Sequence, residues 1–385
     1  MQLIPAASRA DEKEFLQLPV TLYAGQKAWI RPLDADIRAV FDPTTNKAYN
    51  LGECRRWLLK EEGRVIGRIA AFFTRNEGPE GGVSGGVGFF ECIDRQQAAN
   101  LLFDTARDWL AAQGATYMDG PVNFGRRDKW WGLLTSGFEL EPNYQSNYHL
   151  PYYQKLFEGY GFKTYYQQYT FLKPVFEPLS QRLEQKADRI SKDPAYTFEH
   201  LKIGELDRFT KDIMEVYNQA WVKHEGVATL SMEQARSIIG QLKPILDEKI
   251  IWVGYYKGSP VAIFVCIPEV NQILKHVNGR MDLWGKLKFF WHNKIGRNRK
   301  MLGMVFGVVP QHQGKGVDGA IIHAMARVLY KDKRYETLEM TGIGDFNPKM
   351  ILVVRQVGGR VCKVHTTYRY LFDREQPFER MKSIR

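Results

Sequence analysis

The chain has 385 residues, of which 44% are apolar and 25% charged, and its formal net charge is +11. This is ordinary globular composition with enough apolar residues for a sizeable core, and the length favours two domains. No apolar run reaches about 18 residues, so we expect no transmembrane helix, and with charged residues soon after Met1 we expect no signal peptide. We therefore expect a cytoplasmic location.

The first half of the chain reads as alternating strands and helices. Gly114 and Gly161 are placed to end two of the helices. The expected strands are Leu3–Ala6, Cys54–Glu61, Val65–Thr74, Gly86–Ile93, Tyr117–Val122 and Lys163–Phe171. The expected helices are one that follows Ser8, Arg95–Gln113 and Pro151–Tyr160.

The second half repeats that order of elements. The expected strands are Thr197–Leu201, Ile250–Tyr256, Pro260–Pro268, Met301–Val309, Glu336–Thr341 and Arg360–Phe372. The expected helices are Glu205–Trp221, Asp318–Tyr330 and Pro348–Val357. The shared order predicts two similar domains, residues 1–172 and 195–385, joined by a linker over residues 173–194.

Four cysteines are scattered along the chain. None of them is spaced as in a zinc or dithiol motif, so we expect small buried apolar residues in a reducing compartment. They are Cys54, Cys92, Cys266 and Cys362. No His/Glu cluster has metal spacing either, and we propose no metal site.

The most informative segment runs from Val305 to Gly319, where an apolar strand leads into a glycine loop and then into an apolar helix. Glycines let backbone N–H groups turn toward a ligand without a Cβ in the way. These amides, the helix N-terminus and Lys315 predict a phosphate site. The alternative is a glycine turn that binds no ligand.

Two known phosphate motifs fit this loop poorly. A P-loop needs Gly, four residues and then Gly-Lys-Ser/Thr, whereas Gly307 lies too far from Gly314 and Gly316 replaces the hydroxyl residue. Gly314, Gly316 and Gly319 match the dinucleotide fingerprint, but that fingerprint should open a larger parallel sheet. Here a hairpin precedes the loop, and only one helix and one strand follow Thr341.

The segment Gln311–Gly316 resembles the Gln/Arg-x-x-Gly-x-Gly/Ala loop of the GNAT (Gcn5-related N-acetyltransferase) family. Val308-Val309-Pro310 is similar to the end of that family's fourth strand, and the segment from Asn347 to Gly359 to its Asn…Gly-Phe segment. The resemblance covers roughly residues 195–372 and implies a mixed-sheet α/β fold with two tandem GNAT-like domains.

The resemblance also implies a ligand, acetyl-coenzyme A or another acyl-coenzyme A, bound by the second domain. The loop amides would hold its pyrophosphate, and the strand backbone would pair with its pantetheine arm. The implied cofactor-binding residues are Val308, Val309, Gln311, Gln313, Gly314, Lys315, Gly316, Val317 and Asn347. His312, inside the loop, is expected to face solvent.

Acyl transfer of this type needs a neutral amine, an N–H group facing the developing oxyanion, a base for the amine proton and an acid for the thiolate. Strand backbone near Val308 would supply the N–H group. The family often uses a late tyrosine as the acid, and the equivalent position here is Val354. Replacement candidates, among which the sequence does not choose, are Glu339, Tyr368 and Tyr370.

The first half lacks the loop, because its strand Phe89–Ile93 passes to Asp94–Gln97 without a glycine. We interpret this half as a degenerate GNAT-like domain that shapes the substrate site. Candidate substrate-binding residues, for an acidic or planar substrate, are Asn123, Arg126, Arg127 and Trp130. The alternative is a packed loop with a solvated charge run.

Three functions remain open from the sequence. The first is an acyl-coenzyme A-dependent N-acyltransferase acting on an unknown small-molecule or peptide amine. The second is a Fem-type peptidyltransferase, which also has two GNAT-like domains but takes its acyl group from charged tRNA. The third is a non-catalytic acyl-coenzyme A-binding protein. The intact loop favours the first over the second, and Val354 keeps the third open.

Residues 275–300 form a basic segment with interleaved apolar residues. It carries eight positive charges against Asp282 alone, which is +7 of the net +11. The basic residues are Lys275, Arg280, Lys286, Lys288, Lys294, Arg297, Arg299 and Lys300. In a helix, Trp284, Leu287 and Trp291 share one face. Either this face packs on the domain, or the segment binds an anionic partner: an acidic substrate, RNA or lipid headgroups.

Overall fold

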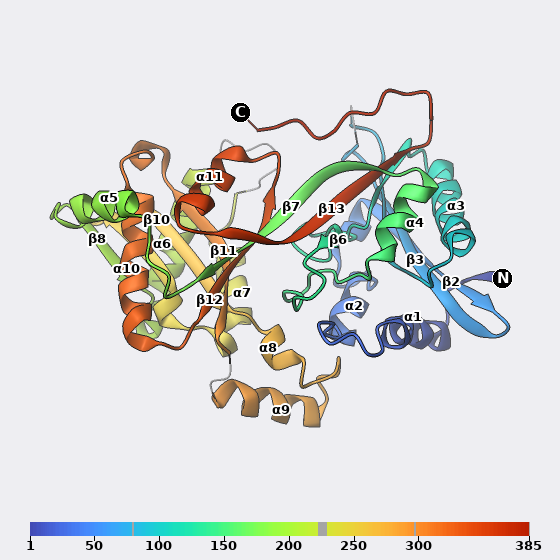
Figure 1. Ribbon diagram of the computed structural model, residues 1–385, viewed down its shortest axis with the longest axis horizontal. Helices are drawn as coiled ribbons and strands as arrows, with labels where there is room; N and C mark the ends of the chain where they lie inside the picture. Colours follow the sequence, from blue (N-terminus) through green and yellow to red (C-terminus); the bar gives the residue numbers. More distant parts are fainter. Residues whose placement is uncertain (79–80, 222–228, 296–297, 385) are drawn as a thin grey trace.

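The computed structural model describes residues 1–78, 81–221, 229–295 and 298–384 (Figure 1). In chain order the strands are β1 (Gln2–Pro5), β2 (Gly52–Glu61), β3 (Arg64–Thr74), β4 (Ser84–Cys92), β5 (Tyr117–Gly120), β6 (Leu133–Ser136), β7 (Lys163–Pro174), β8 (Tyr196–His200), β9 (Ile251–Tyr256), β10 (Ser259–Pro268), β11 (Lys300–Val308), β12 (Thr337–Gly344) and β13 (Arg360–Leu371). The helices are α1 (Arg9–Leu22), α2 (Asp34–Val40), α3 (Gln96–Ala112), α4 (Tyr152–Tyr160), α5 (Gln181–Ser191), α6 (Leu206–Trp221), α7 (Met232–Leu242), α8 (Asn271–Leu274), α9 (Leu283–Lys294), α10 (Val317–Asp332) and α11 (Pro348–Gln356).

All the strands belong to one mixed sheet that runs through both halves of the molecule. Its order is β1-β2-β3-β4-β5-β13-β7-β12-β11-β10-β9-β8, and β6 pairs with β13 beside this path. The final strand, β13, pairs with β5 and β6 of the first half and, along its length, with β7. In turn β7 pairs with β12 of the second half. The two long strands therefore tie the halves together (Figure 1).

In the first half the alternation of side chains along β2 and β3 buries both faces of the sheet. Leu58 and Ala70 pack with Phe15 of α1, whereas Leu59, Ile69 and Ala71 pack with the apolar face of α3. Neighbouring residues of a strand point to opposite faces, so α1 and α3 cover opposite sides of this part of the sheet.

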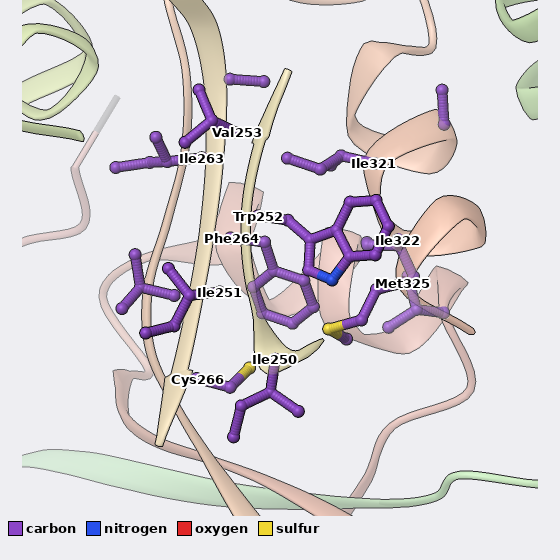
Figure 2. Close-up of a cluster of buried hydrophobic side chains, with 14 of the residues drawn as sticks. Ile250, Ile251, Trp252, Val253, Ile263, Phe264, Cys266, Ile321, Ile322 and Met325 are labelled. Carbon is purple, nitrogen blue, oxygen red and sulfur yellow. The ribbon is translucent and has the colours of Figure 1, made fainter. Parts of the chain in front are cut away.

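The second half has the larger core, built around β9, β10 and α10. Figure 2 shows Trp252 and Phe264 pointing toward Ile322 and Met325 of α10, while Ile251 and Ile263 point to the other side of the two strands. Helix α6 also contacts β9, β10 and β11. Full burial of such side chains contributes about 1.5–3 kcal/mol each, so this cluster is a major source of stability for the second half.

The regular elements expected from the sequence are present, with shifts of a few residues at their ends. The sequence analysis did not identify α2, β6, α7 and α8. The linker predicted over residues 173–194 contains α5, which packs against α10. The domain boundaries stay a prediction, since the sheet is continuous across them.

Two buried histidines predict a stability that falls in mild acid. Burial lowers the pKa of His149 to about 3 and that of His365 to about 4, from an ordinary 6.5. The unfolded chain therefore binds more protons below pH 6.5, so stability is fully present above that value and is lost as pH falls toward 4. Each imidazole contributes roughly 1 kcal/mol per pH unit in this window.

Denaturant titrations of wild type and of His149→Gln/His365→Gln at pH 7 and pH 5 measure this loss. Glutamine can still accept the Leu134 N–H that His149 accepts, and can still donate to the Asn147 carbonyl that His365 contacts. We expect the double variant to lose less stability between the two pH values than wild type. An identical loss in both proteins would contradict the assignment.

Candidate active site

An opening in the sheet lies between β11 and β12. The two strands run parallel and pair from Lys300 with Thr337 only as far as Gly303 with Met340. Beyond that point the edge of β11 that faces β12 has no partner strand among the described residues. The backbone groups along this edge are therefore available to a ligand.

Both strands carry an irregularity where they part. Cys266 pairs with Gly303 and Val265 with Val305, so Met304 is an extra residue in β11. In β12 the register against β7 shifts between Met340 and Ile343, and Gly342 has φ +71°. Such bulges bend a strand and re-aim its backbone, and they are common beside active sites.

A cavity of about 680 Å³ occupies this opening. Its volume lies within the ~300–1,000 Å³ range of sites that enclose small ligands. The walls come from α6, α7, α10 and α11, with the edges of β11 and β12 between them. Apolar residues that line it include Ile213, Ile238, Leu242, Phe306, Ile322 and Met350. The side-chain polar groups are few: Arg126, Asp128, Lys173, Thr210, Tyr217, Thr341 and Asn347.

The glycine loop lies at the end of β11 and leads into α10. The Gln313 side chain donates to the Val308 carbonyl at 2.9 Å, which fixes the loop to the strand. Gly314 has φ +73° and Gly316 has φ +95°, conformations that favour glycine. The backbone N–H groups of Gly314 to Gly319 donate to no acceptor among the described residues. This row of free donors at a helix N-terminus fits a phosphate group.

Helix α5 covers one side of the loop and adds positive charge to it. A Cβ at Gly316 would lie 3.3 Å from the Cβ of Lys186, whereas a Cβ at Gly314 would meet nothing within 4 Å. Arg189 donates to the Lys315 carbonyl at 3.4 Å. The side chains of Lys186, Arg189 and Lys315 are exposed, so three cations surround the exposed part of the loop.

The structure places the remaining predicted cofactor-binding residues as follows. Val308, Val309 and Val317 are buried in the core of the second half, and the Val309 N–H donates to Val261. Gln311 is exposed. Asn347 lines the cavity, and its Oδ1 accepts the N–H of Met350 as the cap of α11.

His312 is partly exposed, and one side of its ring is packed against the domain. Its Nδ1 lies 2.7 Å from the Tyr196 hydroxyl, and its ring packs against those of Tyr196 and Tyr256. Burial, with help from Lys315, lowers the pKa of His312. The aromatic neighbours, which come from β8 and β9, are remote in sequence and explain why the loop alone did not reveal this packing.

The three candidate catalytic residues lie outside the cavity lining. Tyr368 and Tyr370 are buried in the core of the first half, where the Tyr368 hydroxyl donates to Glu158. Glu339 is flanked by Leu338 and Met340, which line the cavity, but its own side chain makes ion pairs with Lys300 at 2.7 Å and Lys363 at 2.8 Å. We therefore carry none of the three forward as an acid or base.

One of the four candidate substrate-binding residues lines the cavity. Arg126 does so, together with its ion-pair partner Asp128. The Asn123 side chain is buried and donates to the Arg126 carbonyl. Trp130 is buried among apolar residues of the first half, and Arg127 lies over the ring of Trp131. The loop of the first half thus reaches the rim of the second-half cavity.

The equivalent opening in the first half is filled by the chain itself. Strands β4 and β5 pair only at Gly86 and Asp119, and the Val122 N–H then donates to Val87. A Cβ at Gly88 would lie 2.0 Å from the Val122 carbonyl oxygen. The backbone of residues 120–122 therefore occupies the space that stays open in the second half.

Sequence reasoning missed several parts of the site. The cations Lys186 and Arg189 lie in the predicted linker, and α7 carries no motif beyond the capping box that begins at Ser231. The bulge at Met304 depends on pairing with β10 and has no local signal. Residues 179–190 can be read as a helix from the sequence, but nothing local places Lys186 and Arg189 beside the loop.

Comparisons with known proteins support the fold. No family model matches the chain. It is 24% identical over 374 residues to "Bacterial ceramide synthase" of Caulobacter vibrioides (strain NA1000 / CB15N), covering 96% of this chain and 97% of that protein. It is also 24% identical over 374 residues to "Protein YghO" of Escherichia coli (strain K12), covering 94% of this chain and 93% of that protein.

Among solved structures, a tandem GNAT protein from the clavulanic acid biosynthesis pathway covers 98% of this chain and 99% of its own, with 12% identity and a TM-score of 0.54. This likeness over the whole length confirms the predicted fold class, an α/β mixed sheet in two tandem GNAT-like domains.

Proposed function

The chain has the fold of the tandem GNAT proteins, and from this premise we propose that it transfers an acyl group from coenzyme A to an amine. We propose further that the acyl chain, the acceptor or both are long and apolar. The observation that carries the proposal is the cavity of about 680 Å³ between β11 and β12, whose walls are mostly apolar. Phe306 of β11 and Ile322 of α10, which line it, belong to the two elements that the glycine loop connects.

The proposed site uses three parts of this chain. The free N–H groups of residues 314–319 and the cations Lys186, Arg189 and Lys315 would hold the phosphates. The unpaired edge of β11 would hydrogen-bond the pantetheine arm as an added strand does. The thioester, which is the activated acyl group that the bound coenzyme supplies, would lie beside the bulges at Met304 and Gly342, where the two strands part.

The bulge at Met304 would also help to lower the activation barrier of the acyl transfer. A backbone N–H of β11 near Met304, freed from the ladder, would face the thioester carbonyl oxygen and stabilise its growing charge. The C–N bond forms and the C–S bond breaks, the amine loses one proton and the leaving thiolate gains one. Thr341 lines the cavity beside this level, and its hydroxyl would position the amine.

The acceptor class follows from the cavity and one relative. A ceramide is the N-acyl derivative of a long-chain amino alcohol, and a relative over nearly the full chain carries the name of a ceramide synthase. A long-chain amino alcohol would place its tail among the apolar residues of α6 and α7 and its amine near Thr341. We therefore propose this class of acceptor.

The proposal is tested with palmitoyl-coenzyme A and sphinganine as probes. The expected result is release of free thiol together with an amide product. Mass spectrometry should give this product the mass of palmitoyl-coenzyme A plus sphinganine minus that of free coenzyme A. Thiol release with no amide, or an amide formed equally from short polar amines, would contradict the acceptor class.

The cavity predicts that affinity rises with acyl length. Each buried CH₂ contributes about 0.8 kcal/mol, so palmitoyl-coenzyme A should bind at least about a hundredfold more tightly than acetyl-coenzyme A. Ala326→Trp would fill part of the cavity and should reduce that advantage about tenfold or more. Ala111→Trp, on an exposed position of α3, is the control. Equal affinities of wild type for the two thioesters by calorimetry would rule out the cavity as the acyl site.

A further inference from the structure

Helix α9 (Leu283–Lys294) extends from the body of the second half, at the lower edge of the molecule in Figure 1. Its start is well defined, because the Asp282 side chain accepts the N–H of Gly285 at 2.8 Å. A Cβ at Gly285 would lie 2.0 Å from the Arg280 carbonyl oxygen, so this turn packs closely on the preceding segment. The helix therefore packs on the rest of the fold, and one of its faces, the inner face, is held against the protein.

The inner face consists of Gly285, Phe289 and His292. Gly285 is buried, Phe289 packs against the apolar cluster of Val270, Leu274 and Val277, and the ring of His292 stacks on that of His276 with centroids 3.9 Å apart. At 3.6 residues per turn these three positions lie on one side of the helix. The opposite side is left to solvent.

That outer side carries large apolar side chains. Their exposed fractions are Leu283 72%, Trp284 73%, Leu287 53%, Phe290 61% and Trp291 66%. Elsewhere in the described chain, exposed large apolar residues are mostly scattered, as is normal for a protein surface. Five on one side of a twelve-residue helix form a continuous patch, which marks a binding surface.

Basic side chains border and end this patch. Lys286 lies at one margin of the apolar face, Lys288 at the other and Lys294 in the last turn, and all three are exposed. None of them forms an ion pair among the described residues. Arg297, part of the same basic segment, lies outside the described residues. Tryptophan, phenylalanine and leucine outward, with lysines at the margins, suit contact with an anionic membrane interface, while the opposite face of α9 packs on the protein instead of facing water.

The other anionic partners fit the helix less well. RNA is held by cations and by aromatic rings that stack on bases. The face does offer exposed rings, but Leu283 and Leu287 at its centre stack on no base and suit an acyl boundary better. A small acidic substrate would need a pocket, and the outer face of α9 lines none of the described cavities. No helix among the described residues is long and apolar enough to span a bilayer, and α9, at twelve residues, would lie along its surface.

The helix is also connected to the cavity of the second half. Leu242 and Ile267 line that cavity, and Ile245 and Val270, a few residues on, belong to the apolar cluster on which Phe289 packs. A bilayer against the outer face of α9 would thus lie near one end of the cavity wall.

We propose that α9 docks the protein on an anionic lipid bilayer, with Trp284, Leu287 and Trp291 in the headgroup–acyl boundary and the lysines against the headgroups. This goes beyond the proposed acyl transfer and does not depend on it. The helix already has a fixed orientation, so docking requires no folding step.

Sedimentation of the full chain with vesicles of equal parts phosphatidylcholine and phosphatidylglycerol tests the proposal. We expect Trp284→Ser/Leu287→Ser/Trp291→Ser to weaken vesicle binding at least about tenfold. Lys286→Gln/Lys288→Gln/Lys294→Gln should weaken it about a hundredfold at low salt, since each cation near an anionic surface contributes to the attraction. Pure phosphatidylcholine vesicles should bind wild type weakly.

Matched control variants separate docking through α9 from nonspecific hydrophobic adsorption and from the effect of overall net charge. Leu101→Ser/Ile203→Ser/Leu352→Ser removes exposed apolar residues elsewhere, and Lys13→Gln/Lys27→Gln/Lys155→Gln removes three exposed charges elsewhere. Both controls should bind vesicles as wild type does. Equal losses in a control and its matched α9 variant, or binding to single-stranded RNA with none to anionic vesicles, would overturn the proposal. Retained circular dichroism excludes unfolding as the cause.

Discussion

Gly314→Asp is expected to weaken coenzyme A binding at least about a hundredfold, or about 3 kcal/mol. The backbone N–H groups of residues 314–319 have no acceptor in the described structure, and the proposed phosphates are their ligands. A carboxylate at position 314 would lie beside the same donors and repel a phosphate about 4 Å away by roughly 4 kcal/mol in a partly screened environment. Isothermal titration with coenzyme A measures the change.

The variant has a close control in Gly258→Asp. Gly258 has φ +80° in the β9–β10 turn, Gly314 has φ +73° in the loop, and a Cβ at either position meets nothing within 4 Å. The backbone strain of the two substitutions is therefore similar, but only one is near the proposed site. Gly316→Asp is a less clean choice, because its Cβ would press on Lys186 of α5. Equal affinities for Gly314→Asp and Gly258→Asp would show that the loop does not bind the phosphates.

Glu339→Ala is expected to lower the free energy of unfolding by about 3–5 kcal/mol. The Glu339 carboxylate is 1% exposed and accepts from Lys300 at 2.7 Å, from Lys363 at 2.8 Å and from the Asn143 amide at 2.7 Å. These partners come from β11, β13 and the first half, so the carboxylate joins the structures of both halves. Its removal leaves two lysine ammonium groups without their counter-charge, one of them fully buried.

The control is Glu379→Ala, which breaks an exposed pair with Lys382 and should cost less than about 1 kcal/mol. Burial alone would raise the pKa of Glu339, but Lys363 and Lys300 lower it below its ordinary value. A lowered carboxyl pKa stabilises the fold above the unfolded pKa, and this is lost as pH falls through the folded one. The deficit of Glu339→Ala in urea titrations should therefore narrow in acid. Similar costs for the two variants at pH 7 would contradict the structural role.

The sequence predicted the parts of this fold that depend on local chemistry. Turns such as Lys257-Gly258 and helix ends such as Gly161 have their own signals, and Gly314 and Gly316 adopt the positive φ values expected of a loop that exposes its amides. The position of β13 was not accessible in this way. Its pairing with β5 joins residues some 250 positions apart, as in the Arg369–Asp119 contact, and no local pattern specifies that partner.

The candidate site also has one part that local sequence reveals and one part that it does not. The loop could be found from residue types, whereas the cavity could not, because it arises where β11 and β12 part and where α6 and α7 pack against them. Glu339 and Tyr368 were candidate catalytic residues on the basis of their residue types alone. Their partners, Lys363 and Glu158, lie on other elements, and only the packing shows that both side chains are already engaged.

An experimental structure of the protein with palmitoyl-coenzyme A tests the central claim most directly. We predict phosphate density at the amides of residues 314–319, the pantetheine arm along the free edge of β11, the sulfur near Met304 and Thr341, and the acyl chain inside the apolar cavity. Ligand density bound to the first half, or a cavity between β11 and β12 that stays empty while the ligand is bound elsewhere, would contradict it.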